Sequence, residues 1–246
     1  MFPLRDHNPS NGRAWVTWAL IAANVAIFLA TWSLPQHELQ LVFLRWGMVP
    51  LRLSFGEGYA TLLTSMFLHG GFMHLAGNML FLWVFGDNLE ERLGHAGFAG
   101  FYVAGGMAAA AAQYAAAPMS QVPMVGASGA IAAVLGGYLL FFPRARVDLL
   151  IILVIFVRIV PVPAGLMLAA WFALQVLGGL GAPADGGGVA FWAHAGGFVA
   201  GLALALRPWL RAGGPAFWRR TDGHPPHAAA GHGLSPSRVP RVRRRR

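Results

Sequence analysis

The sequence predicts an all-α membrane protein, built as one bundle of six transmembrane helices with a first loop that lies in the membrane interface. Two observations lead to this fold class. Hydrophobic residues make up 57% of the 246 residues and charged residues 11%, far below the roughly 25% charged residues of soluble domains. Apolar runs of about twenty residues, the length that crosses a ~30 Å hydrocarbon core, recur along the chain.

The N-terminal part combines a polar segment, an apolar run and a mixed loop. Residues 1–13 are polar and expected to be a loosely ordered cytoplasmic segment. The run Ala14–Ser33 is long enough to be an uncleaved anchor, and it carries tryptophans near both ends, where such rings prefer the membrane interface. Residues 34–60 are too polar to span and too apolar to leave the membrane, so we expect a loop in the interface.

Five further spans complete the predicted membrane domain, residues 14–206. They are expected at Leu62–Phe85, Phe98–Ala117, Pro123–Phe142, Ala164–Leu180 and Val189–Leu206. The apolar stretch Leu149–Val157 is not counted, because nine residues at ~1.5 Å each reach about 14 Å, half of the core. We expect this stretch to be interfacial or re-entrant.

The orientation follows from arginine, which supplies all 18 basic residues. With six spans, sixteen arginines fall on one side, and only Arg45 and Arg52 fall on the other. The arginine-rich side of short loops is cytoplasmic, so both termini are expected in the cytoplasm of a bacterial cell. The tail, residues 207–246, is expected to be disordered and to fix topology or contact anionic lipid rather than nucleic acid.

Four polar residues occupy the first halves of the second, fourth and sixth spans, which run in the same direction: His74, Asn78, Ser128 and His194. They can therefore share one depth. Ionisable groups in spans are costly and indicate function, and a serine beside a histidine can supply a nucleophile and its base. Asp185 lies in a flexible glycine-rich loop, so we expect a dyad without a third carboxylate.

Two other interpretations of these residues stay open at this stage. Ser128 lies in a run of very small residues, which in membrane helices usually serves close packing. His69 and His74 could bind a metal, although their spacing encloses no carboxylate of the kind that zinc hydrolases use. We expect neither a metal nor another cofactor; cysteine is absent, which excludes a thiol nucleophile. His74 and Asn78, on one helix face, can instead stabilise an oxyanion together with the Ser128 N–H.

Taken together, these residues resemble the rhomboid family of intramembrane serine proteases. The matching motifs are Leu68-His69-Gly70-Gly71-Phe72-Met73-His74-Leu75-Ala76-Gly77-Asn78, Gly126-Ala127-Ser128-Gly129 and Ala193-His194-Ala195-Gly196-Gly197. The resemblance implies that Ser128 is the nucleophile and His194 the general base, with an oxyanion hole of His74, Asn78 and the Ser128 amide. His69 is expected to make a structural loop contact. Gly197 and Gly201 would let the sixth helix approach the fourth.

The resemblance also implies a substrate class, namely transmembrane proteins cut in or near their membrane helices. Two departures from the family pattern are Ala132, where an aromatic ring often stacks on the histidine, and Ala60-Thr61, where a Trp-Arg pair is frequent. The alternative is an inactive relative that binds transmembrane helices for quality control or trafficking. Such a protein would be expected to lose Ser128 or His194, and both are present.

Overall fold

The computed structural model describes residues 2–8, 10, 12–153, 156–182 and 188–224. Six helices of 14 to 22 residues form a bundle: α1 (Trp15–Trp32), α5 (Phe72–Leu93), α6 (His95–Ala116), α7 (Ser128–Phe141), α8 (Ala164–Gly181) and α9 (Phe191–Arg211). By length and composition, α1 and α8 are apolar enough to cross a membrane, and α7 is a shorter apolar helix. Each of these helices overlaps one of the six predicted spans, but the second span, Leu62–Phe85, takes in only the first part of α5.

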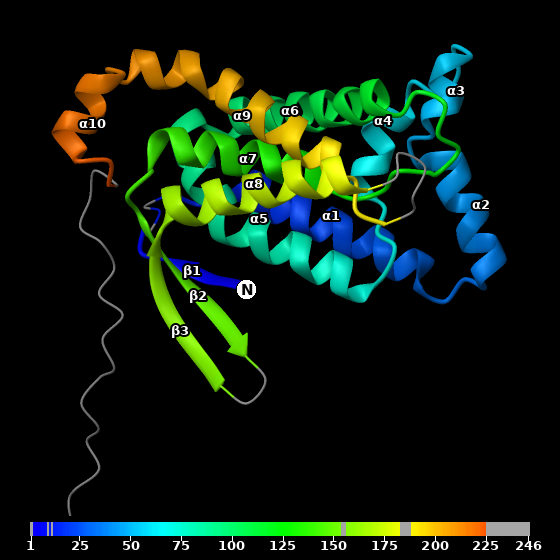
Figure 1. The fold of residues 1–246 in the computed structure, drawn as a ribbon, viewed down its shortest axis with the longest axis horizontal. Helices are drawn as coiled ribbons and strands as arrows, with labels where there is room; N and C mark the ends of the chain where they lie inside the picture. The colour runs from blue at the N-terminus through cyan, green and yellow to red at the C-terminus, as the bar shows by residue number, and fades with distance from the viewer. Residues whose placement is uncertain (1, 9, 11, 154–155, 183–187, 225–246) are drawn as a thin grey trace, which may run out of the picture.

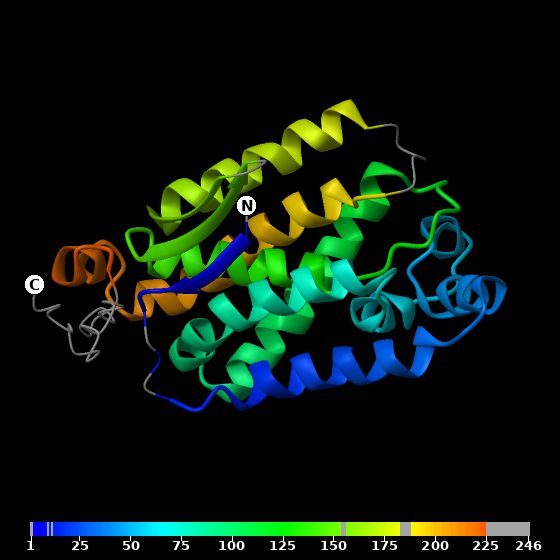
Figure 2. The ribbon, with the colours of Figure 1, turned by 90° about the horizontal axis from the view of Figure 1, so that it is seen from below.

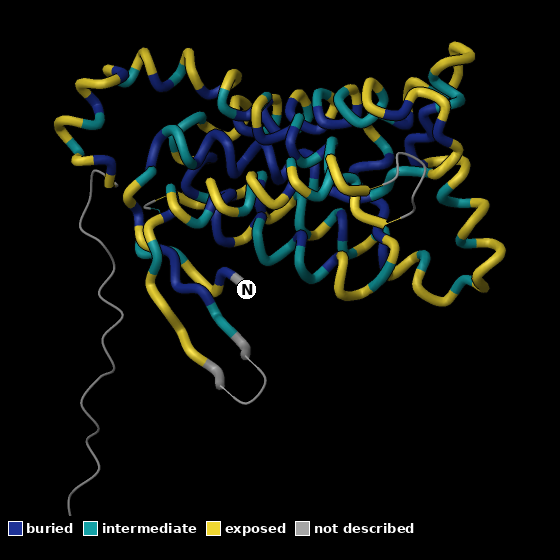
Figure 3. Tube along the Cα trace, viewed as in Figure 1, coloured by how far each residue is buried: buried dark blue, intermediate teal, exposed yellow. Residues whose placement is uncertain are grey.

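The α7 helix forms the centre of the bundle. Eleven of its 14 residues are buried, and the buried part of the tube in Figure 3 follows it. The α1 and α8 helices lie at opposite edges, with α5, α7 and α9 between them (Figure 2). Since α1 and α8 are the most exposed of the apolar helices, their outer faces are the ones that lipid would cover.

Small residues bring α7 and α9 into near contact. A Cβ atom on Gly201 would lie 2.0 Å from the Ala133 carbonyl oxygen, and one on Gly197 would lie 2.2 Å from the Gly129 carbonyl oxygen. In the other direction, a Cβ on Gly136 would lie 2.2 Å from the Phe198 carbonyl oxygen. Only glycine fits these three positions. The spacing Gly197-x3-Gly201 therefore allows the backbone approach expected of small-residue motifs in membrane helices.

The first loop, residues 34–60, is partly helical. It forms α2 (Gln36–Trp46) and α3 (Pro50–Ser54), followed by α4 (Thr61–Thr64) and the 3₁₀ turn η1 (Ser65–Phe67). Proline precedes α2 at position 35 and opens α3, where its fixed φ suits a helix start. Both helices lie at the end of the bundle opposite β1 and α10 (Figure 1).

A three-stranded antiparallel sheet contradicts the all-α prediction. Its strands are β1 (Phe2–Asp6), β2 (Arg146–Leu153) and β3 (Phe156–Pro163), in the order β1-β2-β3. The described residues of the stretch 149–157 therefore lie in two paired antiparallel strands. β-branched residues favour this conformation, and Pro161 and Pro163 are tolerated because β3 is an edge strand.

Residues 2–6 form a strand, contrary to the loose segment expected over 1–13. The Asp148 carboxylate on β2 accepts hydrogen bonds from Arg5, at 2.9 Å, and from His7, at 2.8 Å. Burial raises the pKa of Asp148, but the bonds from His7 and Arg5 outweigh it and hold that pKa below its usual range. The Asp6 carboxylate accepts from Tyr138 Oη of α7 at 2.8 Å. These contacts fix β1 to the bundle.

The C-terminal part is also folded up to residue 224, which corrects the prediction that the tail is disordered from 207 onward. The α9 helix continues to Arg211, and α10 (Pro215–Thr221) folds back against the bundle. Phe217 is buried with its ring 6.0 Å from that of Phe141, and Trp218 Nε1 donates to the Leu140 carbonyl at 2.9 Å. The prediction for residues 225–246 lies outside the described residues.

Candidate active site

Ser128 is the first residue of α7, at the point where an irregular segment enters the bundle. Because α7 has only 14 residues, it rises about 21 Å, which is short of a ~30 Å core. The helix alone therefore does not reach from one face of such a core to the other. The N–H groups of the first helical turn have no partner within the helix. The Ser128 N–H is one of these.

Gly126 gives the serine its open surroundings. Its φ of +128° is in the region that favours glycine. A Cβ atom at this position would lie 2.7 Å from His74 Nε2 and 3.6 Å from Ser128 Oγ. The missing side chain therefore lets the His74 imidazole come close to the serine. On the other side, a Cβ on Gly129 would lie 2.6 Å from Ala109 Cβ, so glycine permits α6 to pack there.

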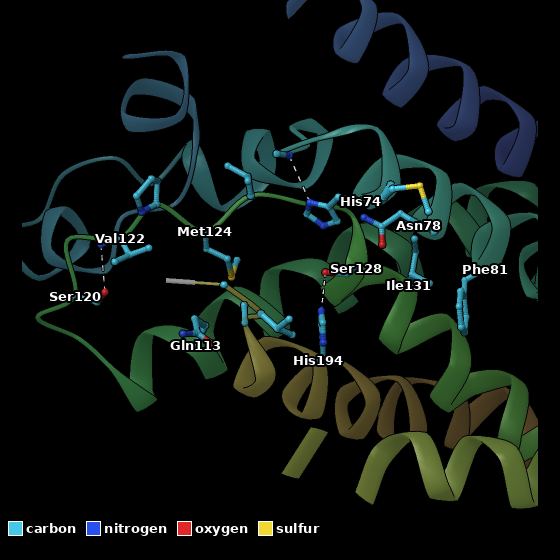
Figure 4. Close-up of a pocket in the computed structure, with 18 of the residues that line it drawn as sticks. His74, Asn78, Phe81, Gln113, Ser120, Val122, Met124, Ser128, Ile131 and His194 are labelled. Atoms are coloured by element: carbon cyan, nitrogen blue, oxygen red, sulfur yellow. Dashed lines mark hydrogen bonds between the residues drawn. The ribbon is translucent and has the colours of Figure 1, made fainter. Parts of the chain in front are cut away.

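His194, in the first turn of α9, meets Ser128 directly. Its Nε2 lies 2.7 Å from Ser128 Oγ, within hydrogen-bonding distance (Figure 4). These residues are 66 positions apart in the chain. The close approach of α9 to α7 at Gly197, one turn below His194, holds the two side chains at the same level.

Asn78 and His74 line the same cavity, one helical turn apart on α5. Asn78 Nδ2 donates to His69 Nε2 at 2.9 Å, which leaves the second N–H of this amide for another acceptor. His69 is only 3% exposed, and its ring packs edge-on against that of His74 at a centroid distance of 5.1 Å. His69 thus contacts both side chains expected in the oxyanion hole, Asn78 and His74. Among the described residues, no group of three or more His, Asp or Glu side chains is placed to hold a metal ion.

A cavity of about 590 Å³ connects these polar groups. The polar end is formed by the four predicted residues, and apolar side chains continue from it between α5, α7 and α8. These include Phe81, Ile131, Leu135 and Trp171. The labelled side chains in Figure 4 show Ser128 and His194 facing each other, with His74 and Asn78 on the α5 side. Apolar walls with a few polar groups at one end are typical of a ligand-binding cavity.

Two residues of α8 that the sequence analysis did not single out contact His194. Gln175 Oε1 lies 2.8 Å from His194 Nδ1, and the Trp171 ring lies 5.8 Å from the imidazole between centroids. Ala132, where the family often has the aromatic, is fully buried within α7. The sequence did contain a signal for Gln175, because it is the single amide in the otherwise apolar predicted span Ala164–Leu180. Asp185, the rejected third member, lies outside the described residues.

The fold and the site together define a mostly helical protein with a half-buried serine–histidine pair at the polar end of a cavity. Comparison with known proteins gives the family. The Rhomboid domain matches residues 56–209, and the chain belongs to the rhomboid family.

Three relatives illustrate the similarity. Rhomboid protein 1, mitochondrial, of Saccharomyces cerevisiae is 30% identical over 195 residues, which cover 76% of this chain and 51% of the yeast protein. The human presenilin-associated rhomboid-like protein, mitochondrial, is 31% identical over 180 residues, 70% of this chain and 43% of the relative. The rhomboid protein YdcA of Bacillus subtilis is 34% identical over 128 residues, 52% of this chain and 63% of the relative. The chain spans about half the length of the curated relatives it matches.

Proposed function

We propose that this protein is an intramembrane serine endopeptidase that cleaves transmembrane proteins with a dyad of Ser128 and His194. The observation that carries the proposal is the 2.7 Å contact between Ser128 Oγ and His194 Nε2 at the polar end of the cavity. A histidine at this distance can remove the hydroxyl proton as the oxygen attacks a carbonyl carbon. Membership of the rhomboid family supports the same reaction class.

The reaction has two halves. Ser128 Oγ adds to the scissile carbonyl while His194 Nε2 takes its proton, and the carbonyl oxygen becomes negative. The Ser128 N–H, His74 and the free N–H of Asn78 are proposed to donate to this oxygen. His194 then protonates the leaving amine, and the C–N bond breaks to give an acyl-enzyme. Water, deprotonated by His194, hydrolyses the ester and regenerates the serine.

The substrate is proposed to be a membrane-spanning segment that is locally unwound. In an α-helix each carbonyl accepts from an N–H four residues on, and the side chains surround the backbone. A peptide bond must leave this arrangement before Ser128 can reach it. The apolar walls at Phe81, Ile131 and Leu135 suit the flanking side chains of such a segment. Transmembrane proteins and the surrounding lipid are therefore the proposed partners.

The six long helices are proposed to span the membrane with both termini in the cytoplasm. Arg45 and Arg52 lie on α2 and α3 at one end of the bundle, whereas β1 and the arginine-rich α10 lie at the opposite end (Figure 1). The end with more arginine is expected to be cytoplasmic. The bacterial cytoplasmic membrane remains the proposed location; of the relatives above, one is bacterial and two are named as mitochondrial.

The test is an assay of the purified protein in detergent or proteoliposomes with a generic transmembrane substrate. We expect a defined cleavage product from the wild type, none from Ser128→Ala, and no effect of a chelator. Substrate binding without cleavage by the wild type would instead favour the inactive helix-binding relative.

A further inference from the structure

The far side of the His194 ring, away from Ser128, is held by an amide from α8. His194 Nδ1 and Gln175 Oε1 are 2.8 Å apart, while His194 Nε2 faces Ser128 Oγ at 2.7 Å. Both ring nitrogens are therefore engaged, one by each neighbouring helix. The proposed dyad contains no group that would choose between the two neutral tautomers of this ring.

A second bond fixes which end of the amide faces the histidine. Gln175 Nε2 donates to the Trp171 carbonyl, one turn earlier on α8, at 3.3 Å. A carbonyl oxygen only accepts, so the nitrogen must point to Trp171 and the oxygen to His194. An amide oxygen also only accepts. His194 Nδ1 must then carry the proton, which leaves Nε2 unprotonated toward the serine hydroxyl, as a general base requires.

The burial of Gln175 fits a role in the site better than a role in the helix. Gln175 is only 9% exposed, and it is the one amide side chain among the 18 residues of α8, which are otherwise apolar. A buried amide is costly in such surroundings unless it is hydrogen-bonded. Gln175 and Trp171 are four residues apart and so lie on one face of α8. That face presents the amide to Nδ1 and the indole ring to the imidazole.

We propose that Gln175 is a positioning residue of the protease. It holds His194 in the Nδ1–H tautomer and orients Nε2 toward Ser128, in place of the carboxylate of a triad. Trp171 limits the tilt of the His194 ring and so supplements the hydrogen bond. This contact comes from α8, because α7 carries Ala132 at the position where the family often has an aromatic ring. The effect of Gln175 on cleavage rests on the proposed function, whereas its effect on the tautomer of His194 does not.

The experiment compares Gln175→Leu with Gln175→Glu. Leucine suits an apolar helix but accepts no hydrogen bond, so we expect the variant to fold. Its kcat should fall about 10- to 100-fold with KM unchanged, by analogy with the loss of a hydrogen-bond partner of a metal-bound histidine. Glutamate keeps an acceptor at the same place. We expect it to retain cleavage, with the acidic limb of the pH–rate profile moved to higher pH because a carboxylate stabilises the imidazolium.

Asn24→Leu is the matched control. Asn24 is a fully buried amide in the apolar helix α1, and its Nδ2 donates to the carbonyl four residues earlier, as Gln175 does. It lies outside the cavity-lining residues, so its replacement should leave kcat and KM unchanged. If the removal of any buried amide lowers activity, cleavage should fall in both Asn24→Leu and Gln175→Leu.

The second readout is independent of cleavage. In ¹⁵N-histidine-labelled protein, with the His194 signals assigned by their loss in His194→Ala, the wild type should show the Nδ1–H tautomer, and Gln175→Leu should show a mixture or the Nε2–H form. An unchanged Nδ1–H tautomer in Gln175→Leu overturns the proposal, whatever the cleavage rate. If the wild type cleaves no substrate, the proposed function fails, while the tautomer measurement still decides the role of Gln175.

Discussion

Gly197 of α9 lies against the carbonyl oxygen of Gly129 in α7, so closely that a Cβ on Gly197 would be 2.2 Å from it. This contact is one residue from Ser128 on one helix and three residues from His194 on the other. It therefore sets the distance between the two side chains of the proposed dyad. A methyl group there cannot be accommodated by a side-chain rotation, because its neighbour is backbone.

We expect Gly197→Ala to move α9 away from α7 and lengthen the Ser128–His194 contact. Overpacking of this kind typically costs about 1–3 kcal/mol, and kcat should fall at least tenfold because the base loses its short contact. Thermal unfolding and cleavage assays on the same preparation measure both effects. Gly100→Ala on α6 is the matched control, since a Cβ there meets nothing within 4 Å. Equal stability and activity of Gly197→Ala and wild type would show that the close approach is not required.

Asn78→Ala should slow cleavage about 10²–10³-fold with the fold intact, which is the usual cost of removing one oxyanion donor. Because Asn78 Nδ2 also bonds to His69 Nε2, His69→Ala should reduce kcat as well, and the double variant should be less impaired than the product of the two single effects. Circular dichroism serves as the control for folding. A wild-type rate in Asn78→Ala would reduce Asn78 to a packing residue of α5.

The docking of β1 is expected to weaken as the pH rises toward neutrality. Burial raises the pKa of Asp6 from 3.8 to about 7, although the hydrogen bond from Tyr138 lowers it in part. Between these values the docked strand binds a proton that the undocked strand releases, so this stabilisation is complete below pH ~4 and is lost as the pH passes through about 7. Hydrogen exchange of residues 2–6, corrected for the intrinsic pH effect, should show faster opening at pH 8 than at pH 6.

Asp6→Asn should remove this dependence, because a neutral amide has no proton to lose. The charged and titratable groups nearby are Tyr138 of α7, Asp87 of α5, Arg5 and Asp148 of the sheet, and His7 just after β1. Asp148 acts in the opposite sense and at lower pH, since its depressed pKa gives stability that disappears only on acidification. A His7→Gln variant should therefore keep the loss near neutrality. If Asp6→Asn keeps the full pH dependence, another group is responsible.

Reporter fusions test the proposed topology. A reporter inserted at position 120, in the segment between α6 and α7, should lie on the side opposite to a reporter at the C-terminus, and an N-terminal reporter should agree with the C-terminal one. The same side for position 120 and the C-terminus would mean that an even number of spans separates them, which contradicts the six-span arrangement.

The pairing of Ser128 with His194 could be anticipated because it depends on local signals, namely a polar residue early in each of two parallel spans and the direction of those spans. The sheet could not be anticipated from the sequence. An apolar run such as Leu149–Val157 has the same composition whether it lies in an interface or in a strand, and β1 reaches β2 through pairs more than 140 residues apart. Such partners leave no periodicity in the sequence.

The role of Gln175 could not be predicted from the sequence for a different reason. One amide in an apolar span has many uses, and its meaning depends on the rotation of α8, which brings it to His194 rather than to lipid. His69 was expected to make a loop contact, but its hydrogen bond to Asn78 requires the turn between η1 and α5 to fold back on the helix. Side-chain partners of this kind follow from packing and not from spacing.

The most direct measurement of the central claim is labelling by a fluorophosphonate probe, followed by mass spectrometry of the modified peptide, alongside cleavage by Ser128→Ala, His194→Ala and the double variant. The probe should label the wild type at Ser128, and His194→Ala much more weakly because the hydroxyl lacks its base. The double variant should be no worse than either single one because the two residues act as a unit. Retained cleavage in Ser128→Ala, or labelling at another residue, would contradict the central claim.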